Sequence, residues 1–139
     1  MKTHSSNFFI IGSIIVVFVA VCIGLAIIGS PQEARKYRFD MQRIHDFKAI
    51  VEAIEHYSQN HKPPLPSTIE TLIQANNSGI LHLQDPEYGT PYEYKIKNQN
   101  TYELCGKFQT TLNAKTDEYQ TGAFWFHGPG IKCFLIKLK

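Results

Sequence analysis

An uncharged run from Phe8 to Ile28 constrains the fold of this chain more than any other feature. The residues that interrupt its large apolar side chains are Gly12, Ser13, Cys22 and Gly24. As an α-helix the run would measure roughly 31 Å, close to the thickness of the hydrocarbon core of a bilayer. A helix that is apolar on every side is not typical of a soluble core surface. The sequence therefore predicts a transmembrane helix over residues 8–29 in contact with the lipid bilayer, after a short tail over 1–7.

The flanks of this run bear on cleavage and orientation. Gly24-Leu25-Ala26 is the nearest match to the exit site of a secretory signal, but it lies inside the apolar run, so we expect the anchor to stay uncleaved. Basic residues are more frequent after the run than before it, which favours a cytoplasmic C-terminal domain under the positive-inside rule. The residues concerned are Lys2 before the run and Arg35, Lys36, Arg38 and Arg43 after it.

The remaining residues, 31–139, match the usual size of one domain. The formal net charge is +2, with 14 basic against 12 acidic residues, which is too balanced for the counterion-driven binding of nucleic-acid proteins. Charged residues make up 19% of the chain and aromatic residues 12%, which indicates a folded core and not a disordered tail. We expect one compact domain and no nucleic-acid partner.

An amphipathic helix is predicted directly after the membrane segment. Ser30-Pro31-Gln32-Glu33 has the form of a capping box with proline at the first helical position. Apolar residues then recur at steps of three and four, at Tyr37, Met41, Ile44, Phe47, Ile50, Val51, Ile54 and Tyr57. The opposite, solvated face is expected to hold Gln42, Arg43, Asp46, Glu52, Glu55 and Gln59. The prolines between His61 and Pro66 should end the helix.

A short second helix and an antiparallel sheet are expected after this turn. A capping box at Ser67–Glu70 predicts a helix through about Ala75, which Asn76, Asn77 and Gly79 stop. From Tyr92 the period changes to two, which predicts a hairpin of strands 92–97 and 101–108 around the turn 98–100. The extended segments 124–127 and 132–138 should flank the turn 128–130. The predicted fold class is α+β, with the amphipathic helix packed on a small antiparallel sheet.

Side-chain alternation places two cysteines on one face of this sheet. Leu104 and Phe108 are expected to face the core, so Cys105 points to the opposite face. Phe134 and its period-two neighbours give Cys133 the same outward direction. If the two strands are neighbours, a Cys105–Cys133 disulfide can form there and would stabilise the fold by roughly 3.5 kcal/mol. A disulfide suits an oxidising compartment, the opposite of what the basic residues favour, so both orientations stay open on these grounds.

Two stretches carry a resemblance to the type IV pilins and the pseudopilins of type II secretion. They are Leu65-Pro66-Ser67 leading to Leu72, and Asp85-Pro86-Glu87-Tyr88-Gly89-Thr90-Pro91-Tyr92-Glu93-Tyr94, which is similar to the DPxGxPYxY turn of the major pseudopilin with one residue inserted. The whole chain also resembles a group of uncharacterised bacterial single-pass membrane proteins. The shared segments are Ser30-Pro31, Arg38 to Arg43, Glu103 to Cys105 and Trp125 to Phe134.

The resemblance implies a pilin-like domain that faces the exterior of the cell and takes part in an envelope assembly. Pilins have a leader that ends in glycine and a glutamate near the start of the apolar run. Here Asn7 precedes Phe8 and no glutamate enters the run, so the expectation is a pilin-like domain on a permanent anchor. The same family implies a calcium site, for which Asp85, Glu87, Asp117 and Glu118 are candidates. Their spacing lacks the density of a calcium loop, so no calcium or other cofactor is expected.

A zinc site and a catalytic site are two more specific alternatives for the residues near the C-terminal end. Cys105, His127 and Cys133 supply three candidate zinc ligands, but a structural site needs four and no Cys-x-x-Cys pair is present. His127 beside Trp125 and before a glycine-proline turn is more typical of a side chain that ties down a loop than of a general base. The chain is therefore not expected to be an enzyme or to hold a metal.

The favoured function is a structural or interaction role, since tyrosine and tryptophan offer large contact areas at low entropic cost. A candidate interaction surface consists of Tyr88, Tyr92, Tyr94, Trp125 and His127. The alternative function is a cytoplasmic-facing regulatory subunit of a membrane complex, which the basic run from Arg35 to Arg43 at a lipid surface would favour.

Overall fold

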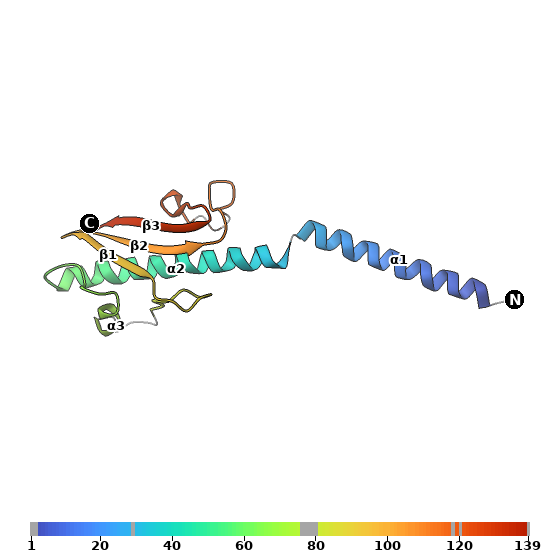
Figure 1. Ribbon diagram of the computed structural model, residues 1–139, viewed down its shortest axis with the longest axis horizontal. Coiled ribbons are helices and arrows are strands. Elements are labelled where there is room, and N and C mark those ends of the chain that lie inside the picture. Colours follow the sequence, from blue (N-terminus) through green and yellow to red (C-terminus); the bar gives the residue numbers. More distant parts are fainter. Residues whose placement is uncertain (1–2, 29, 76–80, 118, 120, 139) are drawn as a thin grey trace. The chain divides into compact units, whose positions relative to one another are not determined.

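The computed structural model describes residues 3–28, 30–75, 81–117, 119 and 121–138. The chain divides into two compact units, Met1–Arg35 and Lys36–Lys139. Figure 1 shows the elements in chain order: α1 (Thr3–Ile28), α2 (Pro31–Asn60), α3 (Thr71–Ala75), β1 (Glu93–Asn98), β2 (Thr101–Phe108), the 3₁₀ helix η1 (Ala123–Trp125) and β3 (Gly130–Lys137). The class is α+β with one antiparallel sheet, as predicted.

The first unit consists mainly of α1. From residue 9 to residue 25 every side chain except the half-buried position 24 is exposed, and the exposed fraction reaches 74% at Phe9 and 69% at Val16. Within the described residues, none of the helices reaches the combined length and hydropathy of a bilayer-spanning segment.

The predicted start and end of α2 are confirmed. The Ser30 hydroxyl accepts a hydrogen bond from the Gln32 N–H at 3.3 Å, and the Ser30 carbonyl accepts those of Glu33 and Ala34. This satisfies donors that the first helical turn leaves unpaired, while Pro31 has none to satisfy. The helix ends at Asn60, before the prolines of the turn.

The second unit contains the sheet, with strand order β1-β2-β3 and both pairs antiparallel. The predicted hairpin of β1 and β2 is confirmed, and Figure 1 shows β2 between its two neighbours. The extended segment predicted over 124–127 is wrong for its first residues. A helical turn forms there because the Trp125 N–H bonds to the carbonyl of Gly122, and His127 makes only an isolated bridge with Leu112.

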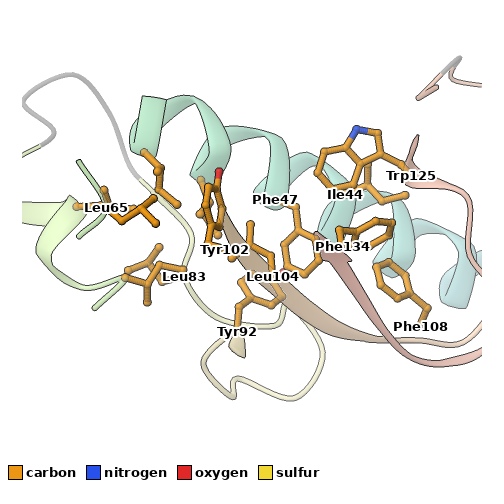
Figure 2. Close-up of a cluster of buried hydrophobic side chains, with 14 of the residues drawn as sticks. Ile44, Phe47, Leu65, Leu83, Tyr92, Tyr102, Leu104, Phe108, Trp125 and Phe134 are labelled. Atoms are coloured by element: carbon orange, nitrogen blue, oxygen red, sulfur yellow. The ribbon is translucent and has the colours of Figure 1, made fainter. Parts of the chain in front are cut away.

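The core lies between α2 and the inner face of the sheet. Ile44, Phe47, Ile50 and Ile54 from α2 are buried, and so are Tyr102, Leu104, Phe108 and Phe134 from the strands. Figure 2 shows Phe47 among aromatic side chains, and its ring lies 4.8 Å from that of Tyr92 and 6.0 Å from that of Phe134. A Cβ at Gly106 would lie 3.0 Å from Cζ of Phe47, so this ring packs closely against β2 where the strand has no side chain.

The short helix after the proline turn starts later than predicted. Three successive turns lead into α3, in which the N–H groups of Thr71, Leu72 and Ile73 donate to the carbonyls of residues 68 to 70. The apolar residues of this segment, Leu65, Ile69 and Leu72, are buried in the same core. Its predicted stop at Asn76, Asn77 and Gly79 lies outside the described residues.

Candidate functional site

Arg43 of α2 is fully buried and stands at the centre of an ion-pair network. Its Nε and Nη2 donate to the two carboxylate oxygens of Asp85 at 2.6 and 2.9 Å. Its Nη1 donates to Asp40 at 2.7 Å, and Nη2 also donates to Glu87 at 2.9 Å. The planar fork of the guanidinium matches a carboxylate in this paired geometry. One side chain therefore joins Asp40 of the same helix to Asp85 and Glu87 of the loop 85–92.

Asp40, one turn earlier on α2, extends the network to the end of β2. Its carboxylate accepts hydrogen bonds from the main-chain N–H of Gln109 at 3.1 Å and of Thr110 at 2.7 Å. The Thr110 hydroxyl donates to the same carboxylate at 2.6 Å. Because Asp40 has no solvent exposure, these donors replace the water that its charge would otherwise require.

Asp46, one turn after Arg43, makes the third connection. Its side chain is 2% exposed and accepts the Tyr92 hydroxyl at 2.8 Å and the Gln42 amide at 2.8 Å. Burial, and next the hydrogen bond to Asp46, raise the pKa of the Tyr92 hydroxyl well above its ordinary value. Tyr92 is therefore a fixed donor that holds the end of the loop on α2.

The charges of Asp85 and Arg43 stabilise each other. Burial alone would raise the pKa of Asp85, but the hydrogen bonds from Arg43 and from the N–H groups of Tyr88 and Glu87 outweigh it and hold this pKa below its usual value. Burial acts against the charge of Arg43 as well, and the bonds to Asp85 and Glu87 reverse that effect and raise its pKa. Both groups stay ionised at neutral pH, which a buried pair requires.

The prediction that Arg43 and Asp46 lie on the solvated face of α2 is wrong. Both are buried, since the loop 85–92 and the end of β2 cover that side of the helix. The helical period identifies which residues share a face of the helix. It does not reveal that another segment of the chain packs on the charged face.

The candidate calcium ligands do not fit an ion. Asp85 and Glu87 already bind the guanidinium of Arg43, so an internal cation occupies the position that a metal would take. Asp117 accepts hydrogen bonds from Thr121 and Gly122 within its own loop. Glu118 lies outside the described residues.

The predicted Cys105–Cys133 disulfide is confirmed. The two residues are directly opposite in the β2–β3 register, and their Cα atoms are 4.0 Å apart. The described part of the chain contains one cluster of metal-ligand types, Glu103, Cys105 and Cys133, and two of its three members are bonded to each other. His127, the third zinc candidate, instead stacks on Phe108 with ring centroids 3.9 Å apart.

The five residues predicted for an interaction surface do not share one. Tyr92, Trp125 and His127 are buried in the core, where aromatic area stabilises the domain itself. Tyr94 is half-buried, and its hydroxyl donates to the carbonyl of Pro66. Tyr88 alone among the five is exposed, at 48%, and the cations of Arg43 and Lys107 lie 5.7 and 5.3 Å from its ring centre.

Beside Tyr88 the surface forms a groove between the loop 85–92 and the outer face of β2. The residues that line it are Asp85, Tyr88, Thr90, Pro91, Tyr92, Glu93, Cys105, Gly106, Lys107 and Ile131. One wall of the groove is the loop 85–92, which Arg43 and Asp46 bind to α2 through Asp85 and Tyr92.

These features define the class of the molecule as an α+β domain with one disulfide and a helix-to-loop ion-pair network, preceded by an apolar helix. In comparisons with known proteins, no family model, curated protein or solved structure matches the chain.

Proposed function

We propose that this chain is a membrane-anchored, non-enzymatic, pilin-like structural or interaction component of a cell-envelope assembly, with its domain on the extracytoplasmic side. The observation that carries the proposal is the exposure of large apolar side chains on all sides of α1, including Phe9, Val16 and Phe18. Soluble proteins rarely expose a continuous apolar area of this kind, and lipid is the solvent that accommodates it. The anchor then consists of the uncharged run from Phe8 to Ile28.

The disulfide supports the extracytoplasmic side. Cytosolic thiols are kept reduced, whereas a bond such as Cys105–Cys133 persists in oxidising compartments. The pilin-like layout supports the structural role: a long helix follows the anchor and packs on an antiparallel sheet, and a DPxGxPY-like turn lies beside that helix. The network around Arg43 is saturated with internal hydrogen bonds, which suits the holding of a loop better than chemistry on a substrate.

The first test separates the two orientations. Free thiols are blocked in intact cells, and the peptides that contain Cys105 and Cys133 are weighed with and without reductant. A linked pair is the expected result. Two free, readily alkylated thiols would refute the extracytoplasmic side and favour the cytoplasmic regulatory subunit, which the exposed basic residues Arg35 and Arg38 also support.

A second test addresses the anchor alone. The membrane fraction is washed at alkaline pH, which releases peripheral proteins and retains those whose helices lie in the hydrocarbon core. We expect the chain to stay in the pellet. A variant with Val16→Arg and Val17→Arg should be released or fail to insert, because each arginine at the centre of a span costs about 3 kcal/mol.

A further inference from the structure

The groove beside Tyr88 lies where β1 separates from β2. The β1–β2 pairing begins with Glu93 opposite Cys105, so among the described residues the last part of β2, Gly106 to Phe108, has no strand partner on that side. The chain before β1 turns away because Tyr92 bonds to Leu83 through its main chain and to Asp46 through its hydroxyl. The ion-pair network thus pulls the loop towards α2 and leaves an opening next to β2.

The main chain of Lys107 faces this opening. In an antiparallel sheet the N–H and C=O of successive residues point alternately to the two neighbours of a strand. The Leu138 N–H donates to the carbonyl of Asn100. The N–H and C=O groups of the even-numbered residues of β2 therefore point towards β3, and those of the odd-numbered residues point towards β1. In agreement with this alternation, the odd-numbered Cys105 is paired with Glu93 of β1. Lys107 is the next odd-numbered residue, and in the described part of the chain no backbone hydrogen bond from the loop reaches it.

Lys107 also supplies a positive charge to the groove. Two carboxylates line the groove, and both are paired. Asp85 is bound to Arg43 at 2.6 Å, and Glu93 is bound to Lys95 at 2.6 Å. Lys107 is exposed, and none of the ion pairs among the described residues includes its ammonium group, which lies over the ring of Tyr88. Ile131, opposite Lys107 in the register, is 78% exposed and supplies an apolar floor on the same face.

We infer that this groove binds an extended peptide segment with an acidic side chain, which pairs with the main chain of Lys107 and continues the line of β1. Backbone pairing at a strand edge supplies the affinity in this mode of recognition, and side chains on alternate positions supply the selectivity. The residue opposite Lys107 directs its side chain to the outer face, where the Lys107 ammonium and Ile131 lie. The inference names a partner chemistry for the interaction role proposed above and rests on that role.

The test uses the full chain, labelled with ¹⁵N, in detergent micelles, and a synthetic capped peptide Thr-Val-Glu-Val-Thr as the probe. Addition of about 1 mM peptide should shift the amide signals of Gly106, Lys107 and Tyr88. A matched peptide with lysine at the centre should bind about threefold more weakly, as expected for one exposed ion pair. A peptide N-methylated at its central residue should not bind, because the backbone donor is lost.

The charge preference is checked with two variants of equal charge change. Lys107→Glu should reverse the preference in favour of the lysine peptide. Lys137→Glu, on the same face of the sheet and opposite Thr101 at its other end, should leave the preference unchanged. The inference fails if no amide in the groove shifts, if the N-methylated peptide binds equally well, or if the glutamate preference survives Lys107→Glu. None of these outcomes affects the thiol and membrane-fraction results, which test the proposed function separately.

Discussion

Arg43 carries its positive charge at a position without solvent exposure, between α2 and the loop 85–92. Sequence patterns treat arginine as a solvent-facing residue, since the side chain alone is costly to bury. The structure offsets that cost with carboxylates from two separate segments, Asp40 on the same helix and Asp85 after α3. The resemblance singled out both segments, but a link of 42 residues in sequence leaves no periodic pattern.

Replacement of Arg43 should therefore be severe. Arg43→Met keeps most of the volume of the side chain but leaves Asp40 and Asp85 buried without a counter-charge, which should lower the free energy of unfolding by about 3–5 kcal/mol. Urea unfolding of the full chain in micelles, followed through the fluorescence of the buried Trp125, measures the change. Arg38→Met on the exposed side of the helix is the control and should change it by less than about 0.5 kcal/mol. Equal effects of the two substitutions would rule out the structural role of the network.

His127 should make the domain sensitive to mild acid. Burial lowers the pKa of its imidazole below the ordinary 6.5, and its Nε2 finds no hydrogen-bond partner among the described residues. The unfolded chain therefore takes up a proton near pH 6.5 while the folded chain does not. Stability is fully present above that pH and falls below it, by up to about 1.4 kcal/mol per pH unit.

The control for this pH dependence is the variant His127→Phe, which keeps an aromatic ring against Phe108 and removes the titrating imidazole. Between pH 7.5 and 5.5 the wild-type protein should lose more stability to urea than this variant does. Asp40 and Lys132, whose charges also act on His127, are common to both proteins. Identical losses would show that His127 is not responsible for the pH dependence.

At the level of elements, the strands were the most predictable part of the domain. Alternation of side chains predicts that Leu104 and Phe108 face the core and that Cys105 and Cys133 share the other face, in agreement with the burial of the first two and the disulfide between the cysteines. This works because the strand period of two is strict and one face is buried. The helical turn at Ala123–Trp125 was missed since three aromatic residues in sequence favour an extended segment, whereas here the positive φ of Gly122 and the packing of Trp125 decide the conformation.

The contact between α2 and β2 predicts the effect of one methyl group. In Gly106→Ala the new Cβ would lie 3.0 Å from Cζ of the buried Phe47, which is packed among four other aromatic rings. Since the ring has little room to move, we expect a loss of about 1–3 kcal/mol from overpacking. Gly128→Ala, where nothing lies within 4 Å, is the matched control. A neutral result for Gly106→Ala in urea unfolding would mean that the helix can shift away from the sheet.

The loop 85–92 should behave as an element that needs no metal. Because Arg43 occupies the place of a cation between Asp85 and Glu87, millimolar calcium should leave the urea midpoint of the full chain unchanged relative to a chelator. The comparison variant is Arg43→Met, in which Asp85 and Glu87 lose their internal cation and calcium can bind in its place. A clear rise of the wild-type midpoint with calcium would contradict the assignment of Arg43 as the counter-ion.

For the whole molecule, the division at Arg35 predicts two independent transitions. In micelles urea should abolish the Trp125 signal of the second unit while α1 stays helical, because a helix in an apolar medium cannot exchange its backbone hydrogen bonds for water. With 26 residues in α1 and 30 in α2, close to half of the helical circular dichroism should remain after the fluorescence transition. Loss of all helical signal in that same transition would count against both the division and the anchor.

The covalent attachment of the counter-ion also has a kinetic consequence. A loop closed by a metal waits for an encounter with a solute, so its closure depends on concentration and on the compartment that the chain has reached. Here the cation belongs to α2 and the anions Asp85 and Glu87 follow in the same chain. Closure is thus a first-order event whose rate does not depend on the concentration of any metal ion, and the loop can adopt its final shape in whichever compartment the chain folds.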